Sequence, residues 1–365
     1  MQAIMTSRLM RDWLPPIAAG AIAGLAFLLF GNTPIVRAAG LALVVVGMAA
    51  TLRWLGAILA FAGSLALAFS PAFWAQTGGG NAGPATIVLA LVGATIVVLV
   101  AIIISRKPAL GFIAGVVIFA IVFWTQVGTP RSLRLTSFVT TWLFYLLLDT
   151  LRRTNPHPED DTTDKPSALY YPVLMLILFA VGVINDPVFT LIAPALILGL
   201  WLAHFRLPMW YWALLLIATG VGIYGIFANF VIPDTPLIQL QLIRDANRWM
   251  DLLTFIIGQF GLGGILLGTL GLARFARWYP VAGIVSMVAY GAYALFGISY
   301  NGADKETLLL PLFIIQIFWM TYAVFTLGEW ARKSSLVLGN YVRLGIHIAA
   351  LAIPVMMLLR LLGTL

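Results

Sequence analysis

The chain has 365 residues, of which 62% are hydrophobic and only 9% are charged, so its composition excludes a soluble globular domain. Its net charge of +8 comes from basic residues that stand singly or in pairs beside apolar stretches, which argues against a nucleic-acid partner and predicts contact with membrane lipids. Because cysteine is absent, disulfides, thiolate catalysis and cysteine metal sites are excluded.

Thirteen apolar stretches are candidates for helices that cross a bilayer, since each span needs about 20 mostly apolar residues. They predict an all-α fold, a polytopic transmembrane helix bundle of about thirteen helices. The second and seventh stretches are short enough to be tilted, broken or re-entrant. The expected spans are 14–31, 36–52, 54–73, 84–104, 108–125, 135–151, 169–185, 187–204, 207–231, 252–273, 279–298, 307–328 and 343–363.

One long polar loop divides this bundle. Residues 152–168 read RRTNPHPEDDTTDKPSA, which is rich in proline and acidic residues and has no apolar periodicity. We therefore expect a disordered acidic loop, in which His157 is a solvated linker residue. The loop separates about six helices in residues 1–151 from about seven in residues 169–365, two halves that we do not treat as independent domains.

The basic residues predict the orientation. With the N-terminus in the cytoplasm, fourteen of the 21 Lys and Arg residues lie inside and seven outside, as the positive-inside rule expects. We expect a multi-pass protein of the plasma or inner membrane, with its N-terminus and the loop 152–168 in the cytoplasm and its C-terminus outside.

The centres of the expected helices are almost free of ionisable side chains, which argues against an ion-coupled carrier. Asp149 and Glu329 fall at the inner helix ends. Neutral Gln259 and Gln316 are expected to form hydrogen bonds between helices. The glycines of Gly258–Gly271 (GQFGLGGILLGTLG) are expected to allow close helix packing rather than to cradle a phosphate.

Charged residues on the outer side are the best placed to meet a substrate. Asn185 and Asp186, followed by proline, also fit a simple helix cap. Residues 304–306 (Asp-Lys-Glu) begin a helix, where carboxylates favour the positive end of the dipole. The segment Pro236–Trp249 has apolar residues at near-helical spacing with charges between them, which predicts that it lies along the surface.

Several stretches resemble, in order, a multi-pass glycosyltransferase-like family that is related to protein O-mannosyltransferases and has the GT-C fold. They are Leu65–Gln76 (LALAFSPAFWAQ), Asn185 with Ala193–Leu196 (APAL), Leu252–Leu272 (LLTFIIGQFGLGGILLGTLGL) and Leu295–Pro311 (LFGISYNGADKETLLLP). The resemblance covers residues 36 to 330. It implies a GT-C-like bundle and a polyprenyl-phosphate sugar as the donor substrate.

The chain departs from this family where the family carries its catalytic acids. The first outer loop, Gly31–Arg37 (GNTPIVR), has no carboxylate; Gly78–Asn81 (GGGN) replaces another acidic position; and Asp186 replaces a histidine. Transfer from a polyprenyl-phosphate sugar needs a base for the acceptor and cationic or metal stabilisation of the departing phosphate. Since the usual base is missing, the sequence favours a GT-C-like protein that lacks standard catalysis and serves as an accessory or structural subunit beside other membrane subunits.

Two alternatives stay open. In an active glycosyltransferase, Asp186 or Asp304 would be the base, and an arginine fork would bind the donor phosphate. The candidate substrate-binding residues are Arg244, Arg248, Asn185 and Asn301; both arginines also fit as headgroup anchors. A lipid or solute transporter is the second alternative. We expect no metal site, and no cofactor beyond a polyprenyl-phosphate sugar donor.

Overall fold

The computed structural model describes residues 2–78, 133–155, 170–233, 236–334 and 338–363, with isolated residues between 94 and 115. The expected spans 84–104 and 108–125 lie outside these described residues, as does most of the loop 152–168. Within the part of the chain that the structure describes, every element longer than an isolated bridge is a helix. The all-α class is therefore confirmed.

The described helices follow one another in two groups. The first group is α1 (Gln2–Phe30), α2 (Ile35–Leu52), η1 (Arg53–Leu55), α3 (Ala57–Ala68), α4 (Pro71–Trp74), η2 (Ala75–Thr77) and α7 (Leu133–Thr154). The second group is α8 (Tyr170–Asn185), η3 (Pro187–Ile192), α9 (Ala193–Leu202), α10 (Met209–Ile226), η4 (Phe227–Val231), η5 (Leu240–Arg244), α11 (Ala246–Trp278), α12 (Pro280–Ser299), α13 (Lys305–Leu308), α14 (Leu310–Ser334), α15 (Gly339–Ala349) and α16 (Ala352–Leu361).

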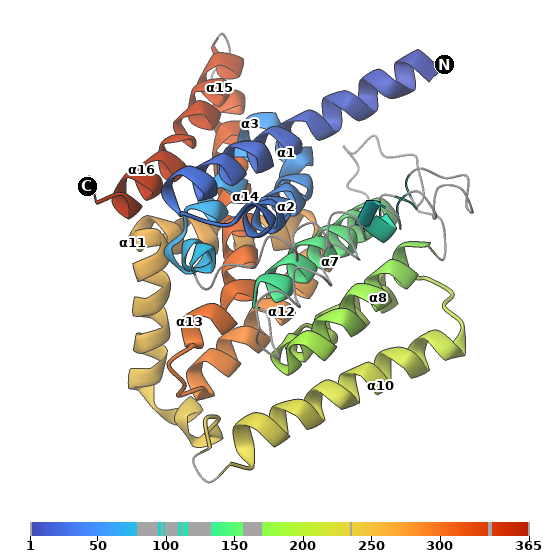
Figure 1. Ribbon diagram of the computed structural model, residues 1–365. Helices are drawn as coiled ribbons and strands as arrows, with labels where there is room; N and C mark the ends of the chain where they lie inside the picture. The colour runs from blue at the N-terminus through green and yellow to red at the C-terminus, as the bar shows by residue number, and fades with distance from the viewer. Residues whose placement is uncertain are drawn as a thin grey trace.

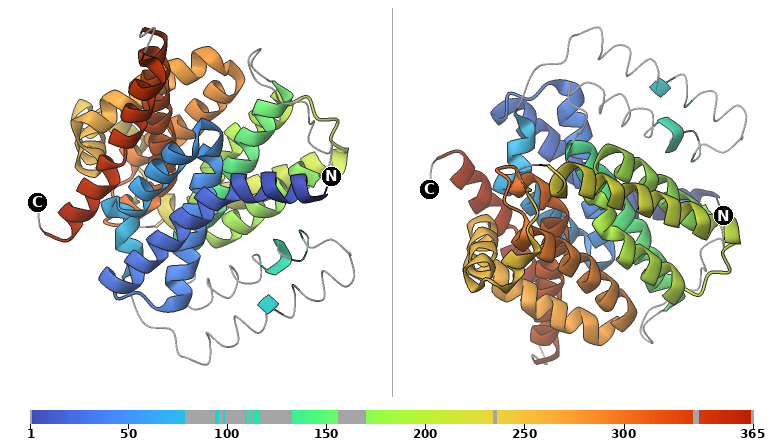
Figure 2. Two further views of the ribbon diagram at one scale, coloured as in Figure 1. Left: turned by 90° about the horizontal axis from the view of Figure 1, so that it is seen from above. Right: turned by 90° about the horizontal axis from the view of Figure 1, so that it is seen from below.

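Helix α14 forms the centre of the bundle. It contacts α2, α3, α7, α11, α12 and α15, and 89% of its most apolar stretch is buried. The corresponding share is 17% for α10 with η4 and 11% for the stretch that contains α15 and α16. Figures 1 and 2 show α14 in the middle, with α15 and α16 on one side and α7, α8 and α10 on the other. The apolar side chains of the outlying helices therefore face away from the protein, as in helices that contact lipid.

Seven helices in the described residues are long and apolar enough to cross a membrane. The second expected span is among them, whereas the seventh and eighth correspond to shorter apolar helices, Tyr170–Asn185 and Pro187–Leu202. Helix α7 is more polar, because hydroxyl side chains and Asp149 interrupt its apolar sequence. These helices support an integral membrane protein; the total of thirteen spans stays a prediction.

The third expected span, 54–73, is not one straight helix. Helix α3 ends at Ala68, and the chain turns by 63° before Pro71–Thr77. The break lies at Ser70, whose backbone is extended (ψ 141°) because the ring of the following Pro71 disfavours a helical conformation there. Counted together, the bent pair would form an eighth span or a re-entrant segment.

Helix α11 has a kink at Gly261, where φ is 69° and ψ is 175°. Only glycine adopts this conformation without strain. Beyond the kink, Gly264, Gly268 and Gly271 are buried against α14, and the Gln316 amide donates to the Gly264 carbonyl at 3.0 Å. The expected roles of the glycines in helix packing and of Gln316 between helices are confirmed.

The connection from α10 to α11 is held against the end of α12 by backbone hydrogen bonds. The Gln239 amide donates to the Ser299 carbonyl at 2.9 Å, and the Asn301 amide donates to the Leu237 carbonyl at 2.8 Å. The surface segment predicted over Pro236–Trp249 therefore runs through η5 into the first turn of α11. This arrangement fixes the start of α11 beside Asn301.

The packing of α11 on α14 gives a first test. A Cβ atom at position 271 would lie 1.8 Å from the Trp319 carbonyl oxygen, whereas one at position 263 would meet nothing within 4 Å. We expect Gly271→Ala to destabilise the protein by about 1–3 kcal/mol, because backbone atoms of α14 must move.

The matched control on the same helix is Gly263→Ala, which is expected to stabilise slightly through its higher helix propensity. Thermal unfolding in detergent measures both variants. Equal melting temperatures for the two would contradict the proposed close approach.

Candidate functional site

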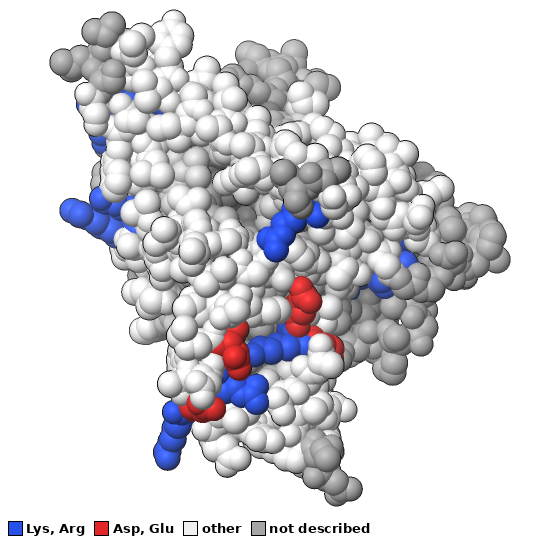
Figure 3. Space-filling view, turned by 90° about the vertical axis from the view of Figure 1, so that its left-hand side faces the viewer, with Lys and Arg blue, Asp and Glu red and all other residues white. Residues whose placement is uncertain are grey.

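Charged side chains gather where η5, α11 and α13 meet. Figure 3 shows acidic and basic side chains close together on the lower part of one face of the molecule. We call the group around Asn301 the Asn301 cluster. It consists of Arg248, Asp251, Asn301, Asp304, Lys305 and Glu306.

Arg248 is joined to Asn301 across 53 positions of the sequence. Its Nη2 atom donates to the Asn301 Oδ1 atom at 2.9 Å. Asp245 begins α11 by accepting a hydrogen bond from the Asn247 amide at 3.0 Å, which places Arg248 in the first turn. Arg248 therefore binds a neutral amide and keeps its full charge.

Asp304 is held by Tyr300. The Tyr300 hydroxyl donates to the Asp304 Oδ1 atom, and the buried tyrosine ring stacks on Phe296 with ring centres 5.0 Å apart. Gly302 permits this contact, because a Cβ atom at that position would collide with the tyrosine ring. The Asp304 carbonyl accepts from the Thr307 amide at 3.1 Å and so starts α13.

The surroundings of Lys305 shift the pKa of its ammonium group in opposing directions. Partial burial lowers the pKa of its ammonium group below the usual 10.5, and the positive charge of Arg248 lowers it further, while Asp251 acts in the opposite direction. Among the described residues, no carboxylate oxygen lies within 4 Å of Lys305. The ion pairs recorded for the described residues are instead formed by Asp149 and Glu329.

Gln259 connects this cluster to the broken helix α3–α4. Its Oε1 atom accepts from the buried Ala72 amide at 2.9 Å, and its Nε2 atom donates to the Glu306 Oε1 atom at 2.8 Å. The expected hydrogen bond between helices is therefore confirmed, with a carboxylate of the cluster as one of its partners.

The structure separates Asn185 and Asp186 from the Asn301 cluster. Both are buried, at 3% and 1% exposure. Asp186 accepts from the Val188 amide at 3.1 Å and caps η3, and the Asn185 amide donates to the Thr136 hydroxyl at 2.9 Å. The predicted capping role is confirmed for Asp186, and burial shields both side chains from a substrate in solution.

The structure thus brings together three of the sequence-predicted residues, Arg248, Asn301 and Asp304. Arg244 is exposed in η5 at the edge of the same face. Sequence reasoning did not name Lys305 and Glu306 as site residues, although they stand directly after Asp304. The run of three charges at a helix start was the available signal.

Two other basic residues of the predicted outer side have structural roles. Arg37 and Arg134 are buried, at 6% and 8% exposure. Arg37 donates to the carbonyl oxygens of Thr77 and Gly78, and Arg134 donates to those of Gln76 and Gly78. These carbonyl groups lie at the end of η2, where the helix no longer supplies backbone N–H donors. The arginine side chains donate the hydrogen bonds in their place.

A metal centre has no support in the residues that the structure describes, since no group of three or more His, Asp or Glu side chains there could hold an ion. The site chemistry consists of cations, carboxylates and amides.

The Gln259 link can be tested by replacing the amide with an isosteric apolar side chain. Gln259→Leu leaves the buried Ala72 amide and the Glu306 carboxylate without these partners, so we expect a loss of about 1–3 kcal/mol. The control is Gln241→Leu at an exposed position of η5. If both variants melt at the same temperature as the unchanged protein, Gln259 does not hold the cluster.

No protein-family model matches this chain, and neither a curated protein nor a solved structure is significantly similar to it. The function is therefore argued from the geometry of the site.

Proposed function

We propose that this chain is a multi-pass membrane protein with a GT-C-like scaffold of about thirteen spans, and that its Asn301 cluster binds the phosphate of a lipid-linked sugar such as a polyprenyl-phosphate sugar. In this proposal the N-terminus is cytoplasmic and the cluster faces the opposite side. The chain acts as a non-catalytic accessory subunit that holds the lipid for partner subunits.

The proposal rests on one observation, the pairing of two cations without a carboxylate partner. Arg248 and Lys305 are close enough for the arginine to lower the lysine pKa. Neither lies within 4 Å of a carboxylate oxygen among the described residues. A phosphate would remove the repulsion between the two cations and accept charge-assisted hydrogen bonds from both.

The surroundings of the cluster suit a lipid. Trp249 is exposed beside Arg248, and its indole N–H donates to the Ile243 carbonyl at 2.8 Å. Along α11, Leu253, Leu262 and Leu266 are also exposed. An acyl or prenyl chain would contact exposed apolar side chains of α11 while its phosphate reaches the cations, and the exposed Trp249 suits the level of the membrane interface.

Two features support binding without catalysis. The loop Gly31–Arg37 carries no carboxylate, and its Arg37 is engaged by backbone carbonyl groups. Asp186, one of the two candidate bases, is buried as a helix cap. Arg37 and Asp186 therefore have structural roles in this chain.

An active glycosyltransferase is the second candidate, because the Asp304 carboxylate stands next to Lys305 and is the remaining candidate base for an acceptor hydroxyl. Tyr300 orients this carboxylate. A half-buried carboxylate beside a phosphate site is an arrangement that suits general-base catalysis.

We predict that the purified protein binds a polyprenyl monophosphate and that Arg248→Gln and Lys305→Gln each weaken the affinity by about 10- to 100-fold, the effect of losing a charge-assisted hydrogen bond. Ligand-induced shifts in melting temperature measure the affinity. The matched control is Arg277→Gln at the other end of α11. Equal binding of the uncharged polyprenol, or unchanged binding by both cluster variants, would refute the proposal.

The same preparation distinguishes the two candidate functions. An accessory subunit binds a polyprenyl-phosphate sugar and transfers no sugar to an acceptor. Asp304→Asn removes a negative charge beside the cations, so phosphate binding should not weaken. Sugar transfer that this substitution abolishes would establish the enzyme and exclude the accessory role.

Binding should also depend on pH in a defined direction. The protonated form of Lys305 binds the phosphate, and its pKa is lowered from 10.5. We expect the affinity to fall as the pH rises toward 10.5, beginning at a lower pH than for an ordinary lysine; the phosphate itself is fully ionised above about pH 8. Lys305→Arg should flatten this decline, since arginine stays charged. A decline of the same size in that variant would assign the effect to another group.

A further inference from the structure

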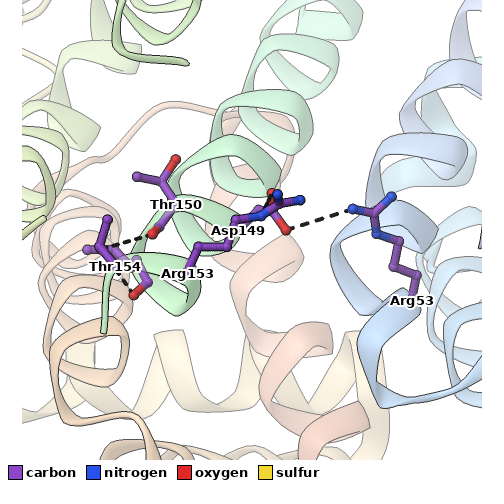
Figure 4. Close-up of polar contacts among 6 residues, drawn as sticks. Arg53, Asp149, Thr150, Arg153 and Thr154 are labelled. Atoms are coloured by element: carbon purple, nitrogen blue, oxygen red, sulfur yellow. Dashed lines mark hydrogen bonds and ion pairs between the residues drawn. The ribbon is translucent and has the colours of Figure 1, made fainter. Parts of the chain in front are cut away.

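Two arginines pair with one carboxylate at the opposite end of the bundle, and a third lines the cavity beside it. The Arg153 Nε atom lies 2.8 Å from the Asp149 Oδ2 atom, and the Arg53 Nη2 atom lies 3.8 Å from the Asp149 Oδ1 atom (Figure 4). Arg152 is the third arginine. We call Arg53, Asp149, Arg152 and Arg153 the Asp149 cluster.

The three arginines are engaged to different degrees. Arg153 forms a close ion pair with Asp149, four residues before it on α7. Arg53 approaches the same carboxylate only to 3.8 Å. The Nε atom of Arg152 is buried and has no hydrogen-bond partner among the described residues. Its guanidinium lies over the Trp54 ring, 5.1 Å from the ring centre. Among the described residues, no protein group therefore uses the Nε donor of Arg152.

The cluster has a surplus of positive charge. Three arginines against one carboxylate leave a net charge of +2. The nearby Asp12 is exposed and forms no ion pair with the cluster in the described part of the chain. Side chains of Arg53 and Arg153 are only 21% and 23% exposed, so water screens this charge poorly.

The position of the cluster indicates which class of anion would compensate its charge. Arg53 lies over the rings of Trp13 and Tyr145, at 5.2 and 5.4 Å. Trp54 packs edge-on against Tyr279, with ring centres 5.4 Å apart. Tryptophan and tyrosine gather at the level of lipid headgroups. A narrow cavity lined by Thr51, Trp54, Asp149, Arg152 and Tyr279 opens among these rings.

We propose that Arg152 and Arg53 bind the phosphate of an anionic membrane lipid at this end of the bundle. Both arginines lie beside Asp149, because Arg53 is 3.8 Å from its Oδ1 atom and Arg152 lines the same cavity as its carboxylate. Because Arg53 belongs to η1 and Arg152 to α7, the lipid ties these two elements together. The proposal is independent of the function assigned to the Asn301 cluster, which lies at the other end of α11 and α14.

The test compares melting temperatures of the full-length protein in neutral detergent with added phosphatidylglycerol or phosphatidylcholine. Phosphatidylglycerol should raise the melting temperature by about 2–4 °C, and phosphatidylcholine should have no comparable effect. Arg152→Gln should reduce the apparent affinity for phosphatidylglycerol about tenfold. Equal effects of the two lipids, or a full response by Arg152→Gln, would overturn the proposal.

Two further variants separate lipid binding from folding. Arg153→Gln breaks the close pair with Asp149, so it should lower the melting temperature without lipid yet retain the rise with phosphatidylglycerol. Arg332→Gln, at an exposed arginine paired with Glu329, should respond like the unchanged protein. If glycerol phosphate at the same concentration reproduces the rise, the site takes a soluble phosphate compound and the lipid proposal is wrong.

Discussion

The close approach of α11 to α14 determines how the two ends of the molecule are built. At Gly268 and Gly271 there is no room for a Cβ atom, because Gln316 and the Trp319 backbone occupy that space. Both helices are long, with 33 and 25 residues, so one contact region sets the position of their termini. Arg248 consequently meets Asn301 at one end, while Arg274 lies over Trp330 at the other.

The two ends treat their charges differently. At the Asp149 end, the carboxylates of Asp149 and Glu329 are paired with arginines within 4 Å, and the surplus arginines leave a net positive charge there. At the Asn301 end, Arg248 and Glu306 bind neutral amides instead. Arg248 at one end and Arg152 at the other are held in place without an ion-pair partner among the described residues, which favours an anionic ligand because the cost of ordering these cations has already been met.

The Asn301 cluster also depends on the breaks in two helices. The turn at Ser70 leaves the Ala72 amide available for a hydrogen bond outside the helix. This amide donates to Gln259, whose own amide donates to Glu306. Gly261 then redirects α11 two residues later. A straight α3 would satisfy its own amides and leave Gln259 without this partner. The irregular backbone thus connects the apolar interior to the polar cluster.

The sequence by itself determined the helical class, the glycine packing face, the glutamine links between helices and the capping by Asp186, because these follow from local hydropathy and from side-chain chemistry near each residue. It also identified Arg248, Asn301 and Asp304 as candidates from their charge or their place in a motif. Only the tertiary structure decided that these three lie together, that Asp186 is buried away from them, and that Arg37 and Arg134 bind carbonyl groups. Such contacts join residues up to 187 positions apart, as in Ala72 with Gln259, and they depend on how the helices pack rather than on how apolar each one is.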